Sequence, residues 1–476
     1  MAAPAVPLAI SGCISMNHDE KKSAASAAPL AAGESFLLEN PDIESVDLLI
    51  ADINGVMRGK WAPAEALKKV CQPGINLPMS IFGLDIWGRE VEETGLHIDT
   101  GDRDGFCKAI DGRISRINWA ERPTAQVLMS MLDDKGKPFH ADPRNALQGV
   151  VDRLANAGLT PVVAFELEFY LVDPAAFQAT GKMMRDRDRA HGAFGPEPQN
   201  MYSLSELSGQ SELFADIRAG AIAMGLPIDT IIKEAAPGQF EVNLKHRADP
   251  MAAADDTVLL RRLIAECSNK HGLRATFMAK PFLEWPGNGM HVHASLLDKD
   301  GSNIFSGDEG EERLAHAAAG LLSTMRDALL IFIPSFNGYR RIQPGCYAPT
   351  RIAWGRNNRS VAVRVPASEP AANRLEHRLS GADANPYFVL AAVLGAMLKG
   401  LEEEKAPPDP IEGSAYTMKL PTLSDDMDDA IEDFEKSDFI ADILGEELRR
   451  IYAEVKKVEF TEFMNEITPL ERSTYL

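Results

Sequence analysis

The chain has 476 residues, 45% of them hydrophobic, so it can bury the core of one large domain or of two ordinary ones. Its 49 basic residues against 70 acidic residues give a formal charge of −21, which argues against nucleic-acid binding. No segment reaches the roughly 18 consecutive apolar residues of a membrane span, and five cysteines without a Cys-x-x-Cys spacing indicate free thiols. We therefore expect a cytoplasmic protein that binds neither nucleic acid nor membrane.

The first part of the chain predicts a disordered extension followed by a small domain. Residues 1–38 are rich in Ala, Ser and Pro and have no amphipathic period, which is typical of disorder. The segments 46–51 and 125–131 read as strands of a domain over residues 39–139. No Lys or Arg precedes the Cys13 segment, so its likeness to a lipoprotein cleavage box does not predict a secretion signal.

The remaining residues, 140–476, are predicted to form a larger α+β domain. Asp142-Pro143 is a good helix start, because Asp caps a helix and Pro is tolerated at its first position, and this helix should end near residue 158. Two further helices are expected at 251–271 and 386–404. The acidic stretch 424–435 is expected to be a solvated helix.

Two carboxylates, Glu166 and Glu168, interrupt an apolar segment that runs from Pro161 to Leu171. The β-branched and aromatic content predicts a buried strand, and alternation by two places both acids on the same face. An unpaired buried carboxylate costs several kcal/mol or takes up a proton. A divalent metal or a group of arginines should therefore compensate them.

Three more segments present acidic, imidazole or guanidinium groups at the same period of two. A Pro-Gly turn separates two pieces that each supply a Glu, a Gly-Asn-Gly segment leads into a His-x-His strand, and a short strand carries a Glu between two arginines. The side chains concerned are Glu234, Glu241, His291, His293, Ser295, Arg374, Glu376 and Arg378.

Five carboxylates with one or two imidazoles form a hard, oxygen-rich ligand set that suits two or more Mg²⁺ or Mn²⁺ ions. Arginines crowd one stretch of the chain, as expected where phosphate oxygens and a substrate carboxylate are bound. These arginines are Arg341, Arg356, Arg359, Arg364, Arg374 and Arg378. Metal ligands together with arginines indicate phosphoryl transfer.

Each of these motifs also has an ordinary structural explanation when it stands alone. A Glu-x-Glu strand is more often the solvated face of an edge strand, and a His-x-His pair more often serves no metal. Arginine-rich loops commonly contact only water and acidic neighbours, and a single Gly-x-Gly is too weak to indicate a phosphate loop. Their joint occurrence is what favours a catalytic site.

Taken in chain order, these motifs give the sequence a resemblance to the glutamine synthetase family that runs from about Asp47 to the C-terminus. The motifs that carry the resemblance are Asp52-Ile-Asn-Gly55 with Arg58-Gly-Lys60, Glu166-Leu-Glu168, Lys233-Glu234, Glu241-Val-Asn243, Gly289-Met-His291-Val-His293-Ala-Ser295, Arg341, Arg356-Asn-Asn-Arg359, Arg364, Arg374 to Arg378, and Asn385-Pro-Tyr. The resemblance implies an N-terminal β-grasp domain, a catalytic domain with a curved antiparallel sheet, and ATP as co-substrate. It also implies a homo-dodecamer of stacked hexameric rings.

The same resemblance assigns roles to individual positions. It implies one metal held by Glu168, Glu234 and Glu241, and a second held by Glu166, His291 and Glu376. It places His293 and Ser295 beside the nucleotide, Arg364 and Arg374 on its phosphates, and Arg359 and Arg378 on the transferring phosphoryl group. It gives Arg341 and the Gly287 backbone to glutamate, and Asp52 to the incoming amine.

Two positions depart from the family pattern. Tyr347 stands where glutamine synthetases carry a Glu that helps to bind ammonium, and Pro286 stands where Asn is frequent. An aromatic ring can bound a pocket for an alkyl amine and lie against its charged head. The sequence therefore favours an ATP-dependent γ-glutamyl ligase for a putrescine-like or polyamine substrate, formed through γ-glutamyl phosphate. Glutamine synthesis from ammonium, a ligase for a monoamine such as ethanolamine, and a non-catalytic scaffold remain alternatives.

Overall fold

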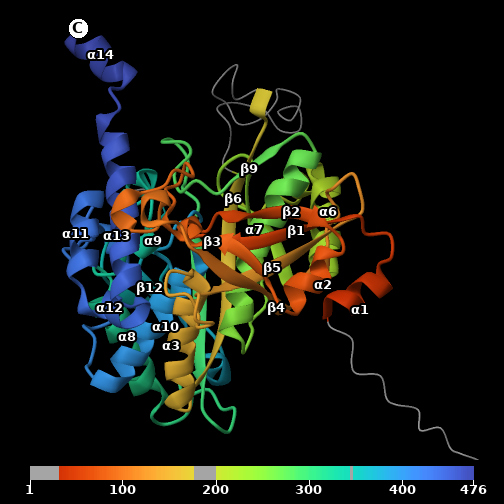
Figure 1. Ribbon diagram of the computed structural model, residues 1–476. Helices are drawn as coiled ribbons and strands as arrows, with labels where there is room; N and C mark the ends of the chain where they lie inside the picture. The colour runs from red at the N-terminus through yellow and green to blue at the C-terminus, as the bar shows by residue number, and fades with distance from the viewer. Residues whose placement is uncertain (1–31, 176–199, 344–346) are drawn as a thin grey trace, which may run out of the picture.

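The computed structural model describes residues 32–175, 200–343 and 347–476, and it contains two β-sheets with helices packed around them (Figure 1). The smaller sheet has the strand order β2-β1-β5-β4-β3, in which β1 and β5 run parallel and the other neighbours run antiparallel. Its strands are β1 (Ser45–Ala51), β2 (Met57–Pro63), β3 (Ile75–Pro78), β4 (Asp104–Arg116) and β5 (Thr124–Leu132). The two predicted strands of the small domain are thereby confirmed.

The larger sheet has the order β11-β12-β13-β10-β6-β8-β7, and β9 pairs with the end of β6. Its strands are β6 (Thr160–Val172), β7 (Ile228–Lys233), β8 (Gln239–Leu244), β9 (Arg274–Thr276), β10 (Met290–Leu297), β11 (Trp354–Arg356), β12 (Val363–Val365) and β13 (Leu375–His377). All of its pairings are antiparallel except β11 with β12. The sheet is therefore antiparallel, as expected, except at this edge, where β12 has an antiparallel neighbour on one side and a parallel neighbour on the other.

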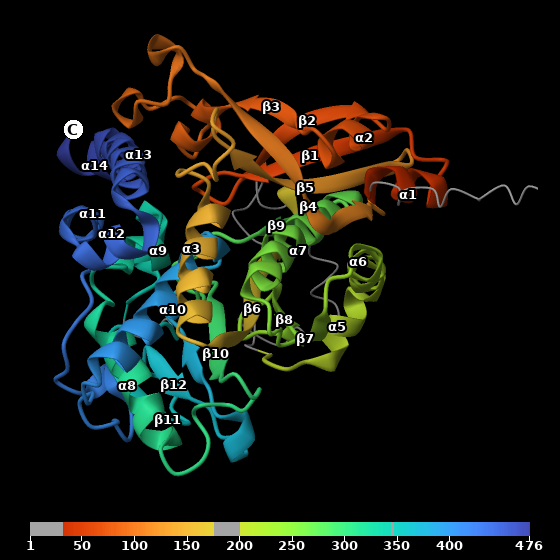
Figure 2. The same cartoon turned by 60° about the horizontal axis from the view of Figure 1, so that its bottom comes forward.

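The helices enclose both sheets. They are α1 (Ala32–Glu39), α2 (Ala66–Cys71), α3 (Pro143–Asn156), α5 (Leu204–Gly209), α6 (Ser211–Met224), α7 (Pro250–Lys270), α8 (Gly310–Ser323), α9 (Leu329–Phe332), α10 (Pro386–Glu403), α11 (Met427–Lys436), α12 (Asp438–Leu444), α13 (Glu446–Asn465) and α14 (Pro469–Tyr475). Short 3-10 helices occupy Met79–Gly83, Glu92–Thr94, Ile98–Thr100, Phe336–Arg340, Pro370–Ala372 and Ala415–Thr417. Figure 2 shows the small sheet lying over α7, with α8 and α10 beside the large sheet. None of the helices in the described ranges is both long and apolar enough to cross a membrane.

Local sequence signals account for the starts of the three long helices near the site. Asp142, Asp249 and Asn385 each accept a hydrogen bond from a backbone N–H of the first turn, and each is followed by a proline. The three predicted helices are confirmed, with bounds within two residues of those expected. The broad apolar face of α10 is buried throughout its first three turns.

The structure corrects two expectations about helical segments. Within the predicted disordered extension, residues 32–38 belong to α1, where Phe36 and Leu37 pack on the core and Gly33 lies against Leu67. Residues 1–31 lie outside the described ranges. The acidic segment near 424–435 is not simply solvated, because α11 is amphipathic and buries the apolar face that contains Ile431 and Phe434.

The division into residues 39–139 and 140–476 stays a proposal, although β5 ends at Leu132 and α3 begins at Pro143. Three cysteines fall in the described ranges, and all three are free thiols: Cys71, Cys107 and Cys267. Cys13 and Cys346 lie outside these ranges.

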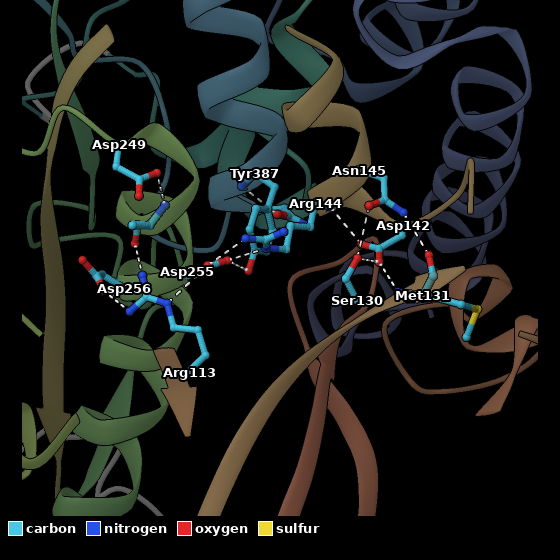
Figure 3. Close-up of polar contacts among 12 residues, drawn as sticks. Arg113, Ser130, Met131, Asp142, Arg144, Asn145, Asp249, Asp255, Asp256 and Tyr387 are labelled. Atoms are coloured by element: carbon cyan, nitrogen blue, oxygen red, sulfur yellow. Dashed lines mark hydrogen bonds and ion pairs between the residues drawn. The ribbon is translucent and has the colours of Figure 1, made fainter. Parts of the chain in front are cut away.

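A buried group of charges joins the small sheet to the helices of the larger half (Figure 3). Arg113 on β4 donates from Nη1 to Asp256 at 2.7 Å, from Nη2 to the carbonyl of Ala252 at 2.8 Å, and from Nε to Asp255 at 3.3 Å. Its side chain is 8% exposed, and the two aspartates are almost completely buried. Each of these buried charges therefore has an opposite charge in hydrogen-bonding contact.

Neighbouring helices complete the same group. Arg144 of α3 and the hydroxyl of Tyr387 of α10 both donate to Asp255, at 2.9 and 2.8 Å. Arg247 donates to the second oxygen of Asp256 at 2.7 Å. Because β4, α3, α7 and α10 all contribute, the group fixes the small sheet relative to the helices that support the large sheet.

We predict that Arg113→Met lowers the free energy of unfolding by about 2–3 kcal/mol, because Asp255 and Asp256 lose the buried cation that they share and keep one arginine each. Arg116→Met on the same strand is the matched control. Arg116 pairs with Asp42 at the surface, so its loss should cost less than about 1 kcal/mol. Urea unfolding of both variants measures the difference, and equal losses would contradict the prediction.

Candidate active site

Four neighbouring strands present polar side chains on one face of the large sheet. The register aligns His293 with Glu376 between β10 and β13, and His291 with Glu166 between β10 and β6. Between β6 and β8 it aligns Glu168 with Glu241. The intervening residues of β6, Phe165, Leu167 and Phe169, are fully buried in the core on the other face. The alternation expected from the sequence therefore places the acids and imidazoles side by side.

Glu166 lies between the two histidines of β10. Its carboxylate accepts from His291 Nδ1 at 3.1 Å and from His293 Nε2 at 2.9 Å. Burial acts to raise the pKa of Glu166, but the hydrogen bonds from the two imidazoles outweigh it and hold the pKa well below the usual range. Glu166 is therefore ionised in this arrangement.

Glu168, Glu234 and Glu241 have the opposite electrostatic character. Burial, reinforced by the charge of Glu234, raises the pKa of Glu168 to about 8. Burial and the neighbouring acids also raise the pKa of Glu241 well above its usual range, and burial raises that of Glu234. The protein leaves this part of the face with more negative charge than its own cations offset, as expected of a site that binds cations.

The ligand atoms gather in two groups that differ from the two predicted metal sets. Oxygen and nitrogen atoms of Glu166, Glu241 and His291 lie within 4.8 Å of one another, and so do those of Glu166, His293 and Glu376. Glu166 belongs to both groups, and His293 joins Glu376 in the group where His291 was expected. The predicted partition, with Glu168 and Glu234 beside Glu241, stays a prediction.

Three predicted arginines surround the Glu376 end of the face. Glu376 accepts from Arg364 Nη1 at 2.6 Å and from Arg378 Nη1, and Arg374 Nε donates to His293 Nδ1 at 3.1 Å. Burial acts to raise the pKa of Glu376, but Arg378 lowers it to about 2. Among the described residues, no acceptor lies within hydrogen-bonding distance of the buried Nε of Arg364 or of Arg378. These donors are suited to an incoming anion.

Arg341 and the glycine segment lie next to Glu168. Arg341 is buried and donates from Nη1 to the carbonyl of Leu379 at 2.7 Å. A Cβ at Gly289 would lie 2.7 Å from Arg341 Nη2 and 3.5 Å from Glu168, and a Cβ at Gly287 would lie 2.7 Å from Cγ of Arg341. Only glycine allows the backbone to approach the arginine and the acid this closely.

Other predicted residues lie away from this face or are differently engaged. The carboxylate of Asp52 is fully buried, accepts from Arg58 Nε at 2.8 Å, and also accepts from the backbone N–H groups of Asn54 and Val56. Burial raises the pKa of Asp52 to about 6, while Arg58 acts to lower it. Within one chain, therefore, Asp52 already has a cationic partner, and its role toward an amine stays a prediction.

The remaining predicted residues are more exposed. Tyr347 is 60% exposed and has a φ of +58°, a left-handed conformation that is uncommon for a bulky residue. Residues 344–346, which precede it, lie outside the described ranges. Arg359 is exposed, Arg356 pairs with Glu311 at the surface, and Ser295 is half-buried. Arg359 still acts electrostatically on the acidic group, because its guanidinium works against burial to lower the pKa of Glu234.

Sequence reasoning assigned no role to three amides at the site, of which two are buried and one is half-buried. Gln239 and Asn288 are almost completely buried and are hydrogen-bonded to one another, with Nε2 of Gln239 donating to Oδ1 of Asn288 at 3.2 Å. Asn243 lies opposite Glu166 in the sheet register, and its buried Oδ1 has no partner among the described residues. Polar residues at alternate positions with Glu241 were the available signal for Gln239 and Asn243.

We predict that Mn²⁺ binds more tightly as the pH rises from 6 to 8, by up to about tenfold per unit for each proton displaced. A raised pKa means that the Glu168 carboxyl still carries a proton below about pH 8, and a metal must displace that proton. Calorimetric titration in buffers of different ionisation enthalpy measures both the affinity and the protons released. Glu168→Gln should release fewer protons, and a pH-independent affinity would contradict the prediction.

Comparisons with known proteins agree with this geometry. The family described as "Glutamine synthetase, catalytic domain" matches residues 140–475. The chain is 37% identical to a γ-glutamylputrescine synthetase of Escherichia coli (strain K12), with 92% of each chain covered. It is 32% identical to a glutamate–isopropylamine ligase of a Pseudomonas species, covering 92% of this chain and 96% of that one.

A solved structure described as "Apo GmaS without ligand" shares the fold. It superposes with a TM-score of 0.80 at 27% identity, over 92% of this chain and 98% of that chain. The ordered motifs, the paired strands of the polar face and these matches lead to one conclusion. The chain belongs to the glutamine synthetase family of glutamate–amine ligases.

Proposed function

We propose that the protein uses ATP to join the γ-carboxylate of glutamate to a putrescine-like amine, through a γ-glutamyl phosphate. The observation that carries the proposal is the polar face of β8, β6, β10 and β13, where four carboxylates and two imidazoles adjoin a group of arginines. A fifth carboxylate, Glu234, follows β7 and acts electrostatically on Glu168. In the first step the γ-carboxylate of glutamate attacks the terminal phosphorus of ATP, the bond to the bridging oxygen breaks, and ADP leaves. The amine then displaces phosphate from the activated carboxyl carbon and loses a proton.

The donor set of this face fits divalent cations. Oxygen atoms predominate, the imidazoles are buried beside them, and the raised pKa values of Glu168 and Glu241 mark negative charge that the protein does not neutralise. We propose that two Mg²⁺ or Mn²⁺ ions are held by Glu166, Glu168, Glu234, Glu241, His291 and Glu376. When bound, such ions polarise phosphate oxygens and offset charge that develops on them.

The arginines around Glu376 are proposed to bind the phosphate groups. Arg364 and Arg374 would hold the nucleotide phosphates with His293 and Ser295 beside the nucleotide, and Arg359 and Arg378 would stabilise the transferring group. The Nε donors of Arg364 and Arg378 have no partner among the described residues, and this supports the assignment because each can still donate one hydrogen bond. Fixed donors of this kind stabilise a developing charge without reorganising during the reaction.

Glutamate is proposed to lie between Arg341 and the Gly287 backbone. The guanidinium of Arg341 is already held by the carbonyl of Leu379, so its orientation is set before substrate binds. Its closeness to Gly289 and Glu168 would bring the substrate next to the acidic face. Binding the α-carboxylate at Arg341 would leave the γ-carboxylate free to reach the phosphoryl donor.

The choice of amine rests on Tyr347 and on the relatives. An aromatic residue in place of a carboxylate weakens a site for bare ammonium and offers apolar contact to an alkyl chain. Two relatives are named for alkyl amines, putrescine and isopropylamine. The left-handed backbone at Tyr347 is the kind of strain that accompanies functional segments.

We expect kcat/KM to be highest for putrescine or spermidine, lower for ethanolamine, and lowest for ammonium, at fixed ATP and glutamate. Each buried methylene adds about 0.8 kcal/mol that ammonium cannot gain. Tyr347→Glu should shift the preference back toward ammonium. Phosphate release measures all four amines. Ammonium as the best substrate would identify a glutamine synthetase, and ethanolamine as the best would identify a monoamine ligase.

We further expect the active protein to be a ring-based oligomer, with a homo-dodecamer as the proposed form. Asp52 is carried by the small sheet and the proposed metal ligands by the large one, and an amine site that needs both would be completed between subunits. Light scattering coupled to size exclusion, with activity assayed in each fraction, tests this. A fully active monomer would contradict it and would remove the reason to place Asp52 in a neighbour's site.

A further inference from the structure

Lys233, the last residue of β7, is a fully buried cation directly beside the proposed metal ligand Glu234. Its ammonium does not point at the acidic face. It donates to the carbonyl of Glu234 at 2.6 Å and to that of Ala236 at 2.7 Å, and it lies 3.4 Å from Glu206 of α5. A buried ammonium requires such acceptors, and in meeting that need Lys233 holds the turn 234–238 in one conformation.

Gln239, at the other end of this turn, connects it to the glycine segment. Its Oε1 accepts from the backbone N–H of Ala236 at 3.3 Å. Its Nε2 donates to the carbonyl of Gly287 at 3.0 Å and to Oδ1 of Asn288 at 3.2 Å. The side chain is 1% exposed, so no water competes for these bonds. One amide therefore joins the turn that carries Glu234 to the backbone proposed to bind glutamate.

The connection continues to the acidic face. Asn288 is fully buried and donates from Nδ2 to the carbonyls of Thr276 and Met278, which holds the segment from behind. The next residue, Gly289, donates its N–H to Glu168 at 2.6 Å. Buried hydrogen bonds thus run from Lys233 through the turn, Gln239 and the glycine segment to Glu168.

We propose that Lys233 and Gln239 are positioning residues: Lys233 sets the position of Glu234 for metal binding, and Gln239 sets the Gly287 segment for glutamate binding. This inference rests on the proposed function, because it takes Glu234 as a metal ligand and Gly287 as part of the glutamate site. Neither residue contacts the reacting atoms. Substituting either should therefore alter one binding step more than the other, which a purely structural role would not do.

The first test replaces the cation without shortening the side chain. Lys233→Met should weaken Mn²⁺ binding by about tenfold or more, as is typical when a partner that orients a metal ligand is lost, while the KM for glutamate changes less than about twofold. Lys245→Met is the matched control, since Lys245 lies just after β8 in the same hairpin and is exposed. Calorimetry with Mn²⁺ alone gives the affinity, and thermal unfolding reports whether each variant is folded.

The second test separates the two halves of the connection. Gln239→Leu should raise the KM for glutamate by about tenfold and change Mn²⁺ affinity less than Lys233→Met does. Glu206→Gln provides a milder change at a partly exposed carboxylate if Lys233→Met does not fold, and it should weaken Mn²⁺ binding by a smaller factor. Wild-type Mn²⁺ affinity in both Lys233→Met and Glu206→Gln would overturn the role of Lys233. An unchanged glutamate KM in Gln239→Leu would overturn that of Gln239.

The outcomes also distinguish this inference from the function on which it rests. A wild-type protein that binds no Mn²⁺ and releases no phosphate with glutamate would overturn both. A wild type that does both, with variants whose metal affinity falls and whose glutamate KM rises together in proportion to lost stability, would overturn only the positioning roles. Parallel losses of this kind are what a structural role predicts.

Discussion

Acidic side chains are concentrated on one face of the large sheet, and the contacts around that face depend on how their charge is compensated. Strand register brings acids of β6, β8 and β13 beside the imidazoles of β10, while the opposite face of β6 is fully apolar. Two of the acids are stabilised by partners of this chain, Glu166 by histidines and Glu376 by arginines. For Glu168 and Glu241, burial outweighs the partners that this chain supplies and raises the pKa of each carboxyl. These raised pKa values are part of the basis for the proposed cation sites.

In the group around Arg113, by contrast, every buried charge has an opposite charge in contact with it. There, arginines from β4 and α3 and a tyrosine from α10 hydrogen-bond two buried aspartates of α7. Such a group fixes one element against another, because each of the two aspartates is held by arginines from different parts of the chain. At the polar face, in contrast, Nε groups of Arg364 and Arg378 and the Oδ1 of Asn243 lack partners among the residues that the structure describes. Unsatisfied buried groups are costly, and their concentration at one place is typical of a binding site.

Between these extremes lies the buried hydrogen-bonded connection from Lys233 to Glu168. The polar groups of this connection are hydrogen-bonded to one another. The acidic residues that it positions, however, are not fully compensated by cations of the protein. Binding sites need this combination, because a ligand with a raised pKa is useful only if its position is maintained while a proton is exchanged for a metal. The large sheet, the glycine segment and the Pro-Gly turn all contribute backbone to that arrangement.

Much of the architecture followed from local pattern. Period-two alternation indicated that Glu166 shares a face with Glu168, the Asp142-Pro143 pair marked the start of α3, and a broad apolar face indicated α10. The order of motifs indicated the family. Only the tertiary structure decided that Glu166 bonds both histidines, that Arg58 occupies the carboxylate of Asp52, and that Gln239 bonds the Gly287 segment. The physical reason is that alternation is a property of each strand by itself, whereas the partner of a side chain depends on strand order and register, which long-range packing sets.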